Sequence, residues 1–198
     1  MIWHRKVCWF AVALVAIALS GCGTSASPRL YTLSSSAAPD VAPALQTSVI
    51  VEPVVVPAAV DQPQMVLQTG PNQVEVEEFD RWDAPLSDNI AHAVAGDLSV
   101  LLATPNVATG ALPGYIAGYT VTINIQRFES LKDQAALVDA VWVVRNAAGK
   151  TKSGRTIARE TLQGSGFDAL AGAHSRALTK LSEDIASAIR TDAREKTL

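Results

Sequence analysis

The two histidines that follow the first 21 residues, His92 and His174, are the first candidates for proton transfer. A catalytic imidazole needs a nucleophile or a carboxylate within hydrogen-bond reach, and neither histidine belongs to a motif that supplies one. His92 falls among the polar residues of a predicted helix, which favours the surface. His174 falls on or beside the apolar stripe of a second predicted helix, which favours a packed, hydrogen-bonded side chain. We therefore expect no catalytic residue.

Three other motifs suggest catalysis, phosphate binding or metal binding, and each lacks a required part. Gly164-Ser165-Gly166 is not the Gly-x-Ser-x-Gly elbow of hydrolases, and it fits a loop before the last helix. Gly149-Lys150-Thr151 resembles the end of a phosphate loop, but Val144 stands where that loop needs its first glycine. Four acidic residues alternate along a predicted strand, as on a solvated face: Glu75, Glu77, Glu78 and Asp80. We expect neither an enzyme nor a metal-binding or cofactor-binding residue.

The thiol of Cys22 has neighbours that indicate a specific modification. It ends the stretch Leu19-Ser20-Gly21-Cys22, which resembles a bacterial lipobox. At a lipobox a diacylglycerol is attached to the cysteine sulfur, the chain is cut before the cysteine, and the new amino terminus is acylated. We therefore expect Cys22 to be the lipid attachment site, with a covalent diacylglycerol and an N-acyl chain and no other cofactor.

The residues before Cys22 have the order of a signal peptide. Three basic or titratable residues, His4 to Lys6, precede an apolar run of about 13 residues, whereas a membrane-spanning helix needs roughly 20. The alternatives are an ordinary secretory signal that contains a cysteine and an N-terminal transmembrane helix. Two or more acyl chains anchor a protein stably. Because Gly23 stands where an aspartate would favour retention in the inner membrane, we expect the periplasmic face of the outer membrane.

The composition restricts the partners and the redox chemistry. The 198 residues include 16 Lys and Arg and 19 Asp and Glu, which gives a formal net charge of −3. Loss of residues 1–21 removes Arg5 and Lys6 and shifts the balance to about −5. A mildly acidic chain argues against nucleic acid as the main partner. Cys8 would leave with the signal peptide and Cys22 would carry lipid, so we expect no disulfide.

We expect the chain to have three parts. Residues 1–21 form the lipoprotein signal peptide, residues 22–46 the acylated cysteine and a flexible tether, and residues 47–198 a single domain. The tether is rich in Ser, Ala, Pro and Thr, and about 24 such residues would reach roughly 80 Å when fully extended. Within it, residues 29–33 form a short apolar-aromatic patch that can dock as an edge strand.

The domain combines strand-like runs with two amphipathic helices. The first helix is predicted from Pro85 to Ala103 with Asp83 as its N-cap, and the second over residues 167–190. A Pro/Gly-rich loop is predicted over residues 104–118. The predicted strands cover residues 47–57, 62–70, 72–82, 119–128, 135–146 and 151–164. This pattern predicts an α/β fold with a mixed, largely antiparallel sheet packed by two long helices.

Several stretches, in order along the chain after Cys22, carry a family resemblance. They are Tyr31-Thr32-Leu33, VDQPQMVLQTGPNQV, EEFDRWDAPLSDNIAHAVAGDLSVLL, the pair RFES and ALVDAVWVV, and ALTKLSEDIASAIR. The most specific part is the spacing of Phe79, Arg81, Trp82, Pro85 and Leu86. Together they resemble the ABC-type transport auxiliary lipoprotein family of the PqiC type. The sequence departs from the family at Asp61-Gln62-Pro63, where an arginine is expected before the proline.

The resemblance implies a non-enzymatic outer-membrane lipoprotein that works with a periplasm-spanning protein of mammalian-cell-entry (MCE) domains. Such systems move phospholipid or other hydrophobic molecules between the two membranes, and an inner-membrane transporter of the ABC or PqiA-like type would be an indirect partner. The family fold resembles the N-terminal domain of TolB, and a homo-oligomeric ring would suit the function. Trp82 and Arg81 are the candidate partner interface; the alternative is that Trp82 packs against the start of the first helix.

Other functions stay open from the sequence. The lipoprotein could itself bind lipid in a cavity, or it could serve as an envelope-integrity or assembly factor. Lipid that co-purifies with the domain would indicate a cavity. A periplasmic hydrolase is a third possibility, and it would require an activity that is lost when His174 is replaced.

Overall fold

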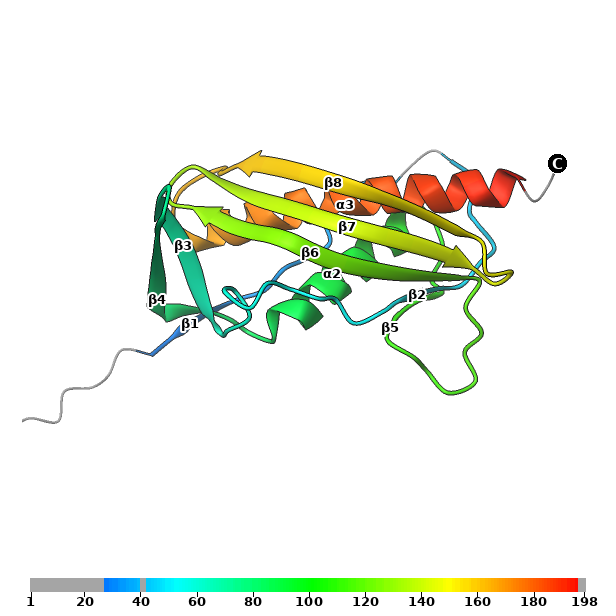
Figure 1. Cartoon of the computed structure of the whole chain (residues 1–198), viewed down its shortest axis with the longest axis horizontal. Coiled ribbons are helices and arrows are strands. Elements are labelled where there is room, and N and C mark those ends of the chain that lie inside the picture. Colours follow the sequence, from blue (N-terminus) through cyan, green and yellow to red (C-terminus); the bar gives the residue numbers. More distant parts are fainter. Residues whose placement is uncertain (1–26, 40–41, 196–198) are drawn as a thin grey trace, which may run out of the picture.

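The computed structural model describes residues 27–39 and 42–195. Cys22, the signal peptide and the cleavage site expected from the sequence lie outside the described residues. The described chain forms eight strands and two helices (Figure 1). The strands are β1 Arg29–Tyr31, β2 Val49–Val51, β3 Gln64–Gly70, β4 Gln73–Trp82, β5 Val107–Thr109, β6 Tyr119–Leu131, β7 Ala135–Asn146 and β8 Thr151–Thr161. The helices are α2 Leu86–Leu101 and α3 Gly166–Glu195.

The eight strands form one mixed sheet (Figure 1). β3 and β4 make an antiparallel hairpin, and β6, β7 and β8 make an antiparallel meander. The pairings of β1 with β4, of β2 with β5 and β6, and of β3 with β6 are parallel. The order β1-β4-β3-β6-β7-β8 leads from one margin of the sheet to the other, with β2 and β5 beside another part of β6. The predicted α/β fold with a mixed sheet and two long helices is confirmed.

The meander forms where side chains alternate most regularly. In the first half of β6, the odd-numbered residues from Tyr119 to Ile125 are buried, and the residues between them are half-buried or exposed. Asn146 closes the turn between β7 and β8, since its side-chain oxygen accepts hydrogen bonds from the backbone N–H groups of Ala148 (3.0 Å) and Lys150 (3.1 Å). At a turn, an asparagine side chain can accept the hydrogen bonds that backbone N–H groups no longer form with a neighbouring strand.

Both helices pack on one face of the sheet and against each other (Figure 1). Their apolar stripes are fully buried in a common core: Leu86, Ile90, Val94 and Leu98 from α2, and Leu178, Leu181, Ile185 and Ile189 from α3. Burial of one such side chain contributes roughly 1.5–3 kcal/mol. The two stripes therefore fix both helices to the sheet.

The start of α2 differs from the sequence prediction. Pro85 occupies the N-cap position, and no side chain caps the helix there. Asp83, the predicted cap, instead accepts a hydrogen bond of 3.0 Å from the Asn89 side chain. The prediction of an Asp83 cap is wrong because Pro85 lies closer to the helix, with an extended ψ of 135° that ends the preceding segment.

Three boundaries also differ. The run over residues 47–57 gives the short strand β2 and an isolated bridge at Val55, because Pro53 cannot donate to a ladder. The predicted loop over residues 104–118 contains the short strand β5. The last helix runs to Glu195, beyond the predicted end at residue 190. His92 is exposed on α2, as predicted.

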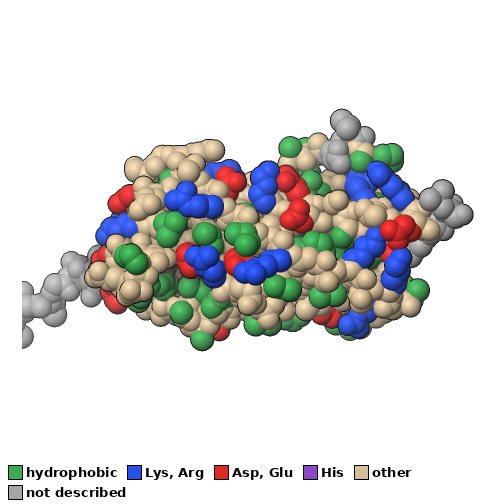
Figure 2. All heavy atoms as spheres, turned by 45° about the horizontal axis from the view of Figure 1, so that its top comes forward, with side chains coloured by type: hydrophobic (Ala, Val, Ile, Leu, Met, Phe, Trp, Pro, Cys, Tyr) green, Lys and Arg blue, Asp and Glu red, His purple; other side chains and the backbone are tan. Residues whose placement is uncertain are grey.

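The second face of the meander is not covered by either helix. Val141 and Ile157 are 40% and 62% exposed, and arginines from β6 and β8 lie among them. Figure 2 shows Lys and Arg side chains spread along one side of the molecule, with hydrophobic side chains between them. This face keeps two carboxylates in ion pairs: Asp139 with Arg155 at 2.7 Å and Glu129 with Arg127 at 2.7 Å.

Candidate functional site

An ion pair between the exposed side chain of Arg29 and the buried carboxylate of Asp80 holds β1 against the sheet. The carboxylate of Asp80, on β4, accepts two hydrogen bonds from the Arg29 guanidinium (2.8 and 2.6 Å) and one from the Tyr31 hydroxyl (2.9 Å). Asp80 is 2% exposed, so water cannot replace these partners. The hydrogen bonds from Arg29 hold the pKa of Asp80 below its usual range. The parallel ladder from Arg29↔Asp80 to Tyr31↔Trp82 completes the attachment.

The residues after β1 cross both helices, and we call residues 32–37 the strap. At its start, the backbone N–H of Leu33 donates to Asn89 (3.4 Å), and the N–H of Ser34 donates to the Ser175 hydroxyl (3.2 Å). Leu33 itself is 5% exposed and belongs to the main core. The strap therefore has both polar and apolar contacts with the helices.

A buried carboxylate holds the end of the strap. One oxygen of Asp97, on α2, accepts hydrogen bonds from the Ser35 hydroxyl (2.7 Å) and from the backbone N–H groups of Ser36 and Ala37 (3.0 Å each). Its other oxygen accepts one from the Thr179 hydroxyl of α3 (3.0 Å). Asp97 is 0% exposed. One side chain thus joins the strap, α2 and α3.

Gly96 lets the strap approach α2 closely. A Cβ atom at this position would lie 2.9 Å from the Cβ atom of Ser35, which is closer than real carbon contacts allow. An alanine here would push the strap away from Asp97. The pair Gly96-Asp97 therefore supplies both the space and the hydrogen-bond acceptor that the strap needs.

These contacts change the geometry expected for the predicted tether. Residues 29–37 are attached to the domain, and the backbone N–H of Leu45 donates to Leu102 (2.9 Å). From the predicted lipid site at Cys22 to Arg29, the chain can span at most about 25 Å. The full reach of roughly 80 Å expected for a free tether is therefore not available while the strap is bound.

Next to β1 lies a cleft of about 360 Å³, which we call the Trp82 cleft. It is lined by Asp61, Gln62, Pro63, Trp82, Asp83, Ala84, Pro85 and Leu86. The backbone N–H of Trp82 donates to Pro63 (2.8 Å), and that of Asp83 donates to Tyr31 (2.9 Å). Three of the stretches that carry the family resemblance therefore meet at this one place. Two exposed carboxylates, those of Asp61 and Asp83, border an otherwise largely apolar lining.

The two candidate interface residues occupy different environments. Trp82 is 5% exposed, and its ring packs edge-on against Phe128, with 6.1 Å between the ring centroids. The Arg81 side chain is 32% exposed, and its guanidinium donates to the backbone oxygen of Glu78 (2.9 Å). Trp82 forms a wall of the cleft and part of the core. Arg81 is therefore the more accessible of the two side chains.

His174 is a core residue, as its place on the apolar stripe predicted. Its ring stacks on Phe128 with 3.9 Å between the ring centroids, and one nitrogen lies 2.9 Å from the Ser130 hydroxyl. Within the described residues its Nδ1 atom has no hydrogen-bond partner. Burial lowers the pKa of His174 to about 3, so the ring is neutral. A fully buried ring has no access to a substrate.

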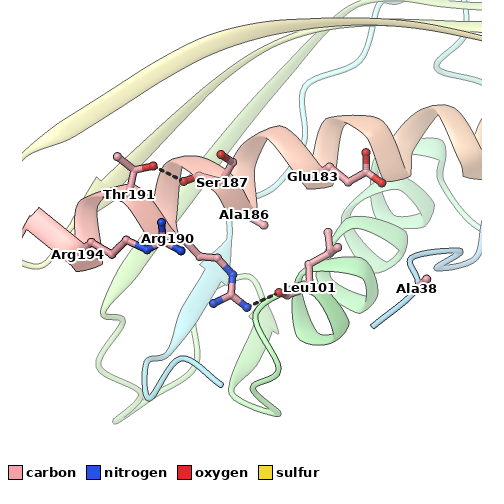
Figure 3. A pocket seen from close by; sticks show the side chains of 8 residues that line it. All are labelled: Ala38, Leu101, Glu183, Ala186, Ser187, Arg190, Thr191 and Arg194. Carbon is pink, nitrogen blue, oxygen red and sulfur yellow. Dashed lines mark hydrogen bonds between the residues drawn. The ribbon is translucent and has the colours of Figure 1, made fainter. Parts of the chain in front are cut away.

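A second cleft, of about 430 Å³, lies between the C-terminal part of α3, the end of α2 and Ala38 (Figure 3). Figure 3 shows the Arg190 side chain reaching from α3 to the end of α2, where it donates to the backbone oxygen of Leu101 (2.7 Å). The other lining side chains are mostly polar or charged. Arg190 also donates to the backbone oxygen of Pro43 (2.9 Å), so it connects α3 both to the end of α2 and to the segment before β2.

None of the described helices has the length and apolar character required to cross a membrane. Across residues 27–39 and 42–195, no group of three or more His, Cys, Asp or Glu side chains could hold a metal ion.

The prediction that Asp80 lies on a solvated face is wrong, because the carboxylate is buried by its hydrogen bonds with Arg29 and Tyr31, and the sequence analysis gave Asp97 no role. Asp97 lies between Val94 and Leu98, two residues of the apolar stripe of α2. A charged residue inside an apolar stripe is a sequence signal for a buried partner. The identity of that partner could not be read, because the strap is 60 residues away in sequence.

Comparisons with known proteins agree with the fold. A model of the family "ABC-type transport auxiliary lipoprotein component" matches residues 31–186. Among solved structures, a family DUF330 protein from Xanthomonas campestris is 17% identical with a TM-score of 0.71, covering 86% of this chain and 99% of its own. An uncharacterized protein is 20% identical with a TM-score of 0.68, covering 83% of this chain and 99% of its own.

A third structure, a PelC dodecamer from Paraburkholderia phytofirmans, is 12% identical and has a TM-score of 0.43. It covers 71% of this chain and 89% of its own chain. A search of curated proteins gives no match. The family match includes the end of β1, the strap, the Trp82 cleft and most of α3. The chain therefore belongs to the ABC-type transport auxiliary lipoprotein family, of the PqiC type.

Proposed function

We propose that this protein is a non-enzymatic outer-membrane lipoprotein that docks an MCE-domain protein in an intermembrane lipid transport system. Cys22 would carry the diacylglycerol and N-acyl chains, and the described domain would face the periplasm. An inner-membrane transporter would be an indirect partner, reached through the MCE-domain protein. Several copies arranged in a ring would suit a tubular partner.

The attachment of the chain at β1 and the strap is the observation that supports this proposal best. Since at most about 25 Å of chain separates Cys22 from Arg29, the β1 end of the domain would stay near the membrane. The Trp82 cleft adjoins β1 through the hydrogen bond from Asp83 to Tyr31. A partner that reaches the outer membrane would therefore meet the cleft at the membrane surface.

The lining of the Trp82 cleft suggests which part of a partner would fit. Its walls include Trp82, Pro63 and Leu86, and its rim carries the carboxylates of Asp61 and Asp83. An apolar side chain next to a lysine or arginine would bury its apolar part and meet opposite charge at the rim. Arg81 would contact acidic groups of the same partner.

Photo-crosslinking in intact cells tests the docking proposal. A photoreactive residue at position 61, on the rim of the Trp82 cleft, should give an adduct that contains an MCE-domain protein. The matched control is the same residue at position 183, which borders the α2–α3 cleft and should give little of that adduct. Repeated absence of an MCE-domain protein at position 61, or equal yield at both positions, would contradict docking at this cleft.

A charge reversal provides a second readout. Asp61→Lys should weaken the crosslinked complex, whereas Glu183→Lys should leave it unchanged. Both side chains border clefts at the surface, so neither change should lower the thermal stability by more than about 0.5 kcal/mol. Phospholipid that remains bound to the purified, folded domain in stoichiometric amount would favour a lipid-carrying role instead.

A further inference from the structure

Exposed apolar side chains gather on β1 and β4. Nine large apolar side chains of the described residues are exposed, and four of them lie on these two strands. They are Leu30, Val74, Val76 and Phe79, which are 61%, 64%, 50% and 44% exposed, and we call them the β1–β4 patch. Figure 1 shows β1, β3 and β4 together at the left end of the molecule, opposite the C-terminal end of α3. A group of exposed apolar side chains usually marks a surface that binds a partner or a membrane.

The β1–β4 patch points away from the helices. Leu30 lies across from Arg81 in the parallel ladder, and Phe79 is two residues before Arg81. Since side chains alternate along a strand, Leu30 and Phe79 lie on the same face. Val74 and Val76 pair with residues of β3 that do not belong to the apolar core. The four side chains are therefore available to a surface outside the domain.

Most carboxylates beside the patch are neutralised within the chain. Three of the four on β4 form ion pairs: Glu75 with Lys132 (3.0 Å), Glu78 with Arg81 (3.4 Å) and Asp80 with Arg29 (2.6 Å). The Arg29 side chain is 66% exposed, and Asp80 uses two of its five N–H donors. The remaining donors can bind a phosphate oxygen. The patch therefore joins apolar side chains to a donor that suits a phospholipid headgroup.

The patch lies where the predicted lipid anchor meets the domain. Arg29 can lie at most about 25 Å from Cys22, and Leu30 follows it directly. The ladder from Arg29↔Asp80 to Tyr31↔Trp82 holds Phe79, the residue before Asp80, beside the same point. A bilayer that held the lipid of Cys22 would therefore be within reach of the patch.

We propose that the β1–β4 patch contacts the phospholipid leaflet that holds the Cys22 lipid. The side chains of Leu30 and Phe79 enter the boundary between headgroups and acyl chains, where apolar and aromatic side chains are stabilised. The Arg29 guanidinium binds headgroup phosphate. The contact rests on the acylation of Cys22 in the proposed function, and it adds an orientation: a flexible anchor alone lets the domain rotate, whereas anchor and patch together hold the Trp82 cleft in one direction.

Quenching of fluorescent labels tests the contact. In the acylated mature chain an introduced cysteine would be the only free thiol, because Cys8 would be removed and Cys22 would carry lipid. Leu30→Cys and Phe79→Cys carry the label in separate variants. Ile157→Cys is the matched control, since Ile157 is 62% exposed on β8. Each labelled protein is reconstituted in vesicles of phosphatidylethanolamine and phosphatidylglycerol, and circular dichroism confirms that it is folded.

The labels at positions 30 and 79 should report the bilayer. Brominated phospholipid should quench both, and aqueous iodide should quench them severalfold less than the label at position 157. Adding Phe79→Asp to the Leu30→Cys chain should expose its label to iodide, whereas adding Ile157→Asp should not. Equal quenching by iodide at all three positions, or a label at position 30 that Phe79→Asp leaves shielded, would overturn the contact.

Photo-crosslinking in intact cells identifies what covers the patch. A photoreactive residue at position 79 should give an adduct with phospholipid, detected by the mass of the modified peptide. Adducts with a protein, either another chain or a second copy of this one, and none with phospholipid would overturn the proposal.

Flotation with the vesicles separates this proposal from the proposed function. A protein that does not float contradicts the lipid anchor and the contact together. A protein that floats, with labels at positions 30 and 79 as accessible to iodide as the label at position 157, contradicts the contact alone. Shielded labels without crosslinking to an MCE-domain protein at position 61 would contradict docking alone.

Discussion

Replacing Asp97 by alanine should release the strap from the helices. The carboxylate accepts four hydrogen bonds, three of them from the strap and one from Thr179. In the variant, the N–H groups of Ser36 and Ala37 would lose their acceptor inside the protein. They would regain hydrogen bonds to water if the strap moved away from α2. We therefore expect local detachment of the strap and not unfolding of the sheet.

The cost can be bounded from these contacts. A hydrogen bond to a charged group contributes about 1.5–3 kcal/mol, but the strap can detach and recover solvation, so the terms do not add. We expect Asp97→Ala to lower the free energy of unfolding by about 3 kcal/mol. For a domain of this size that corresponds to a decrease in Tm of about 6–12 °C. Asp97→Asn keeps one acceptor oxygen and should lose about half as much.

Hydrogen exchange measured by mass spectrometry separates the local effect from the global one. Peptides that cover residues 32–37 should exchange much faster in Asp97→Ala, while β6 and β7 keep their protection. Gly96→Val should have the same effect, because its side chain would displace Ser35. Asp88→Asn changes an exposed aspartate of the same helix and serves as the control. If the strap of Asp97→Ala exchanged hydrogen at the same rate as in the natural chain, and the Tm were also unchanged, Asp97 would not hold the strap.

Three further changes test a glycine contact in the sheet, a buried histidine and the ion pair that holds β1. Gly154→Ala should destabilise the domain by about 2–3 kcal/mol in thermal unfolding, because its Cβ atom would overlap the Trp142 ring. Gly70→Ala adds only ordinary contacts and should be tolerated. Burial keeps the pKa of His174 at about 3, below its unfolded value near 6.5. The free energy of unfolding should therefore fall by up to ~1.4 kcal/mol per pH unit as the pH decreases from about 6.5 to about 3. A folded His174→Phe variant that kept this full pH dependence would contradict the explanation. The hydrogen bonds from Arg29 lower the pKa of Asp80. Their contribution to the free energy of unfolding is therefore complete above the unfolded pKa near 4, and it is lost as the pH falls through the folded pKa. In Asp80→Asn, the free energy of unfolding measured with urea should therefore decrease less at acidic pH than in the natural chain. An equal decrease would count against the ion pair.

Periodic elements of this fold could be read from the sequence. β6 alternates with a period of two, and the stripes of α2 and α3 repeat at helical spacing, so their type and buried face follow from local pattern. The position of His174 on its stripe predicted a packed side chain for the same reason. The family resemblance extended these inferences to the whole domain, and the family match confirms it.

The non-local attachments could not be read in this way. The apolar-aromatic patch at residues 29–33 predicted an edge strand, and β1 confirms it, but its partner Asp80, 51 residues away, could not be identified. Residues 34–37 have no apolar periodicity and look like a tether, yet Asp97 holds them from 60 or more residues away. The place of Leu30 beside β4 likewise depends on the order of strands in the sheet, which local pattern does not determine. The Asp83 cap failed because a proline next to the helix had the stronger effect.

The mass of the mature protein tests the central claim most directly, because the position of the domain at the membrane depends on the lipid at Cys22. Intact-mass spectrometry of the protein extracted from membranes should give a chain that begins at Cys22 and carries a diacylglycerol and an N-acyl chain. The Cys22→Ala variant should lack this mass and should leave the membrane fraction. A mature chain that retains residues 1–21, or one that begins at another residue without lipid, would contradict the account.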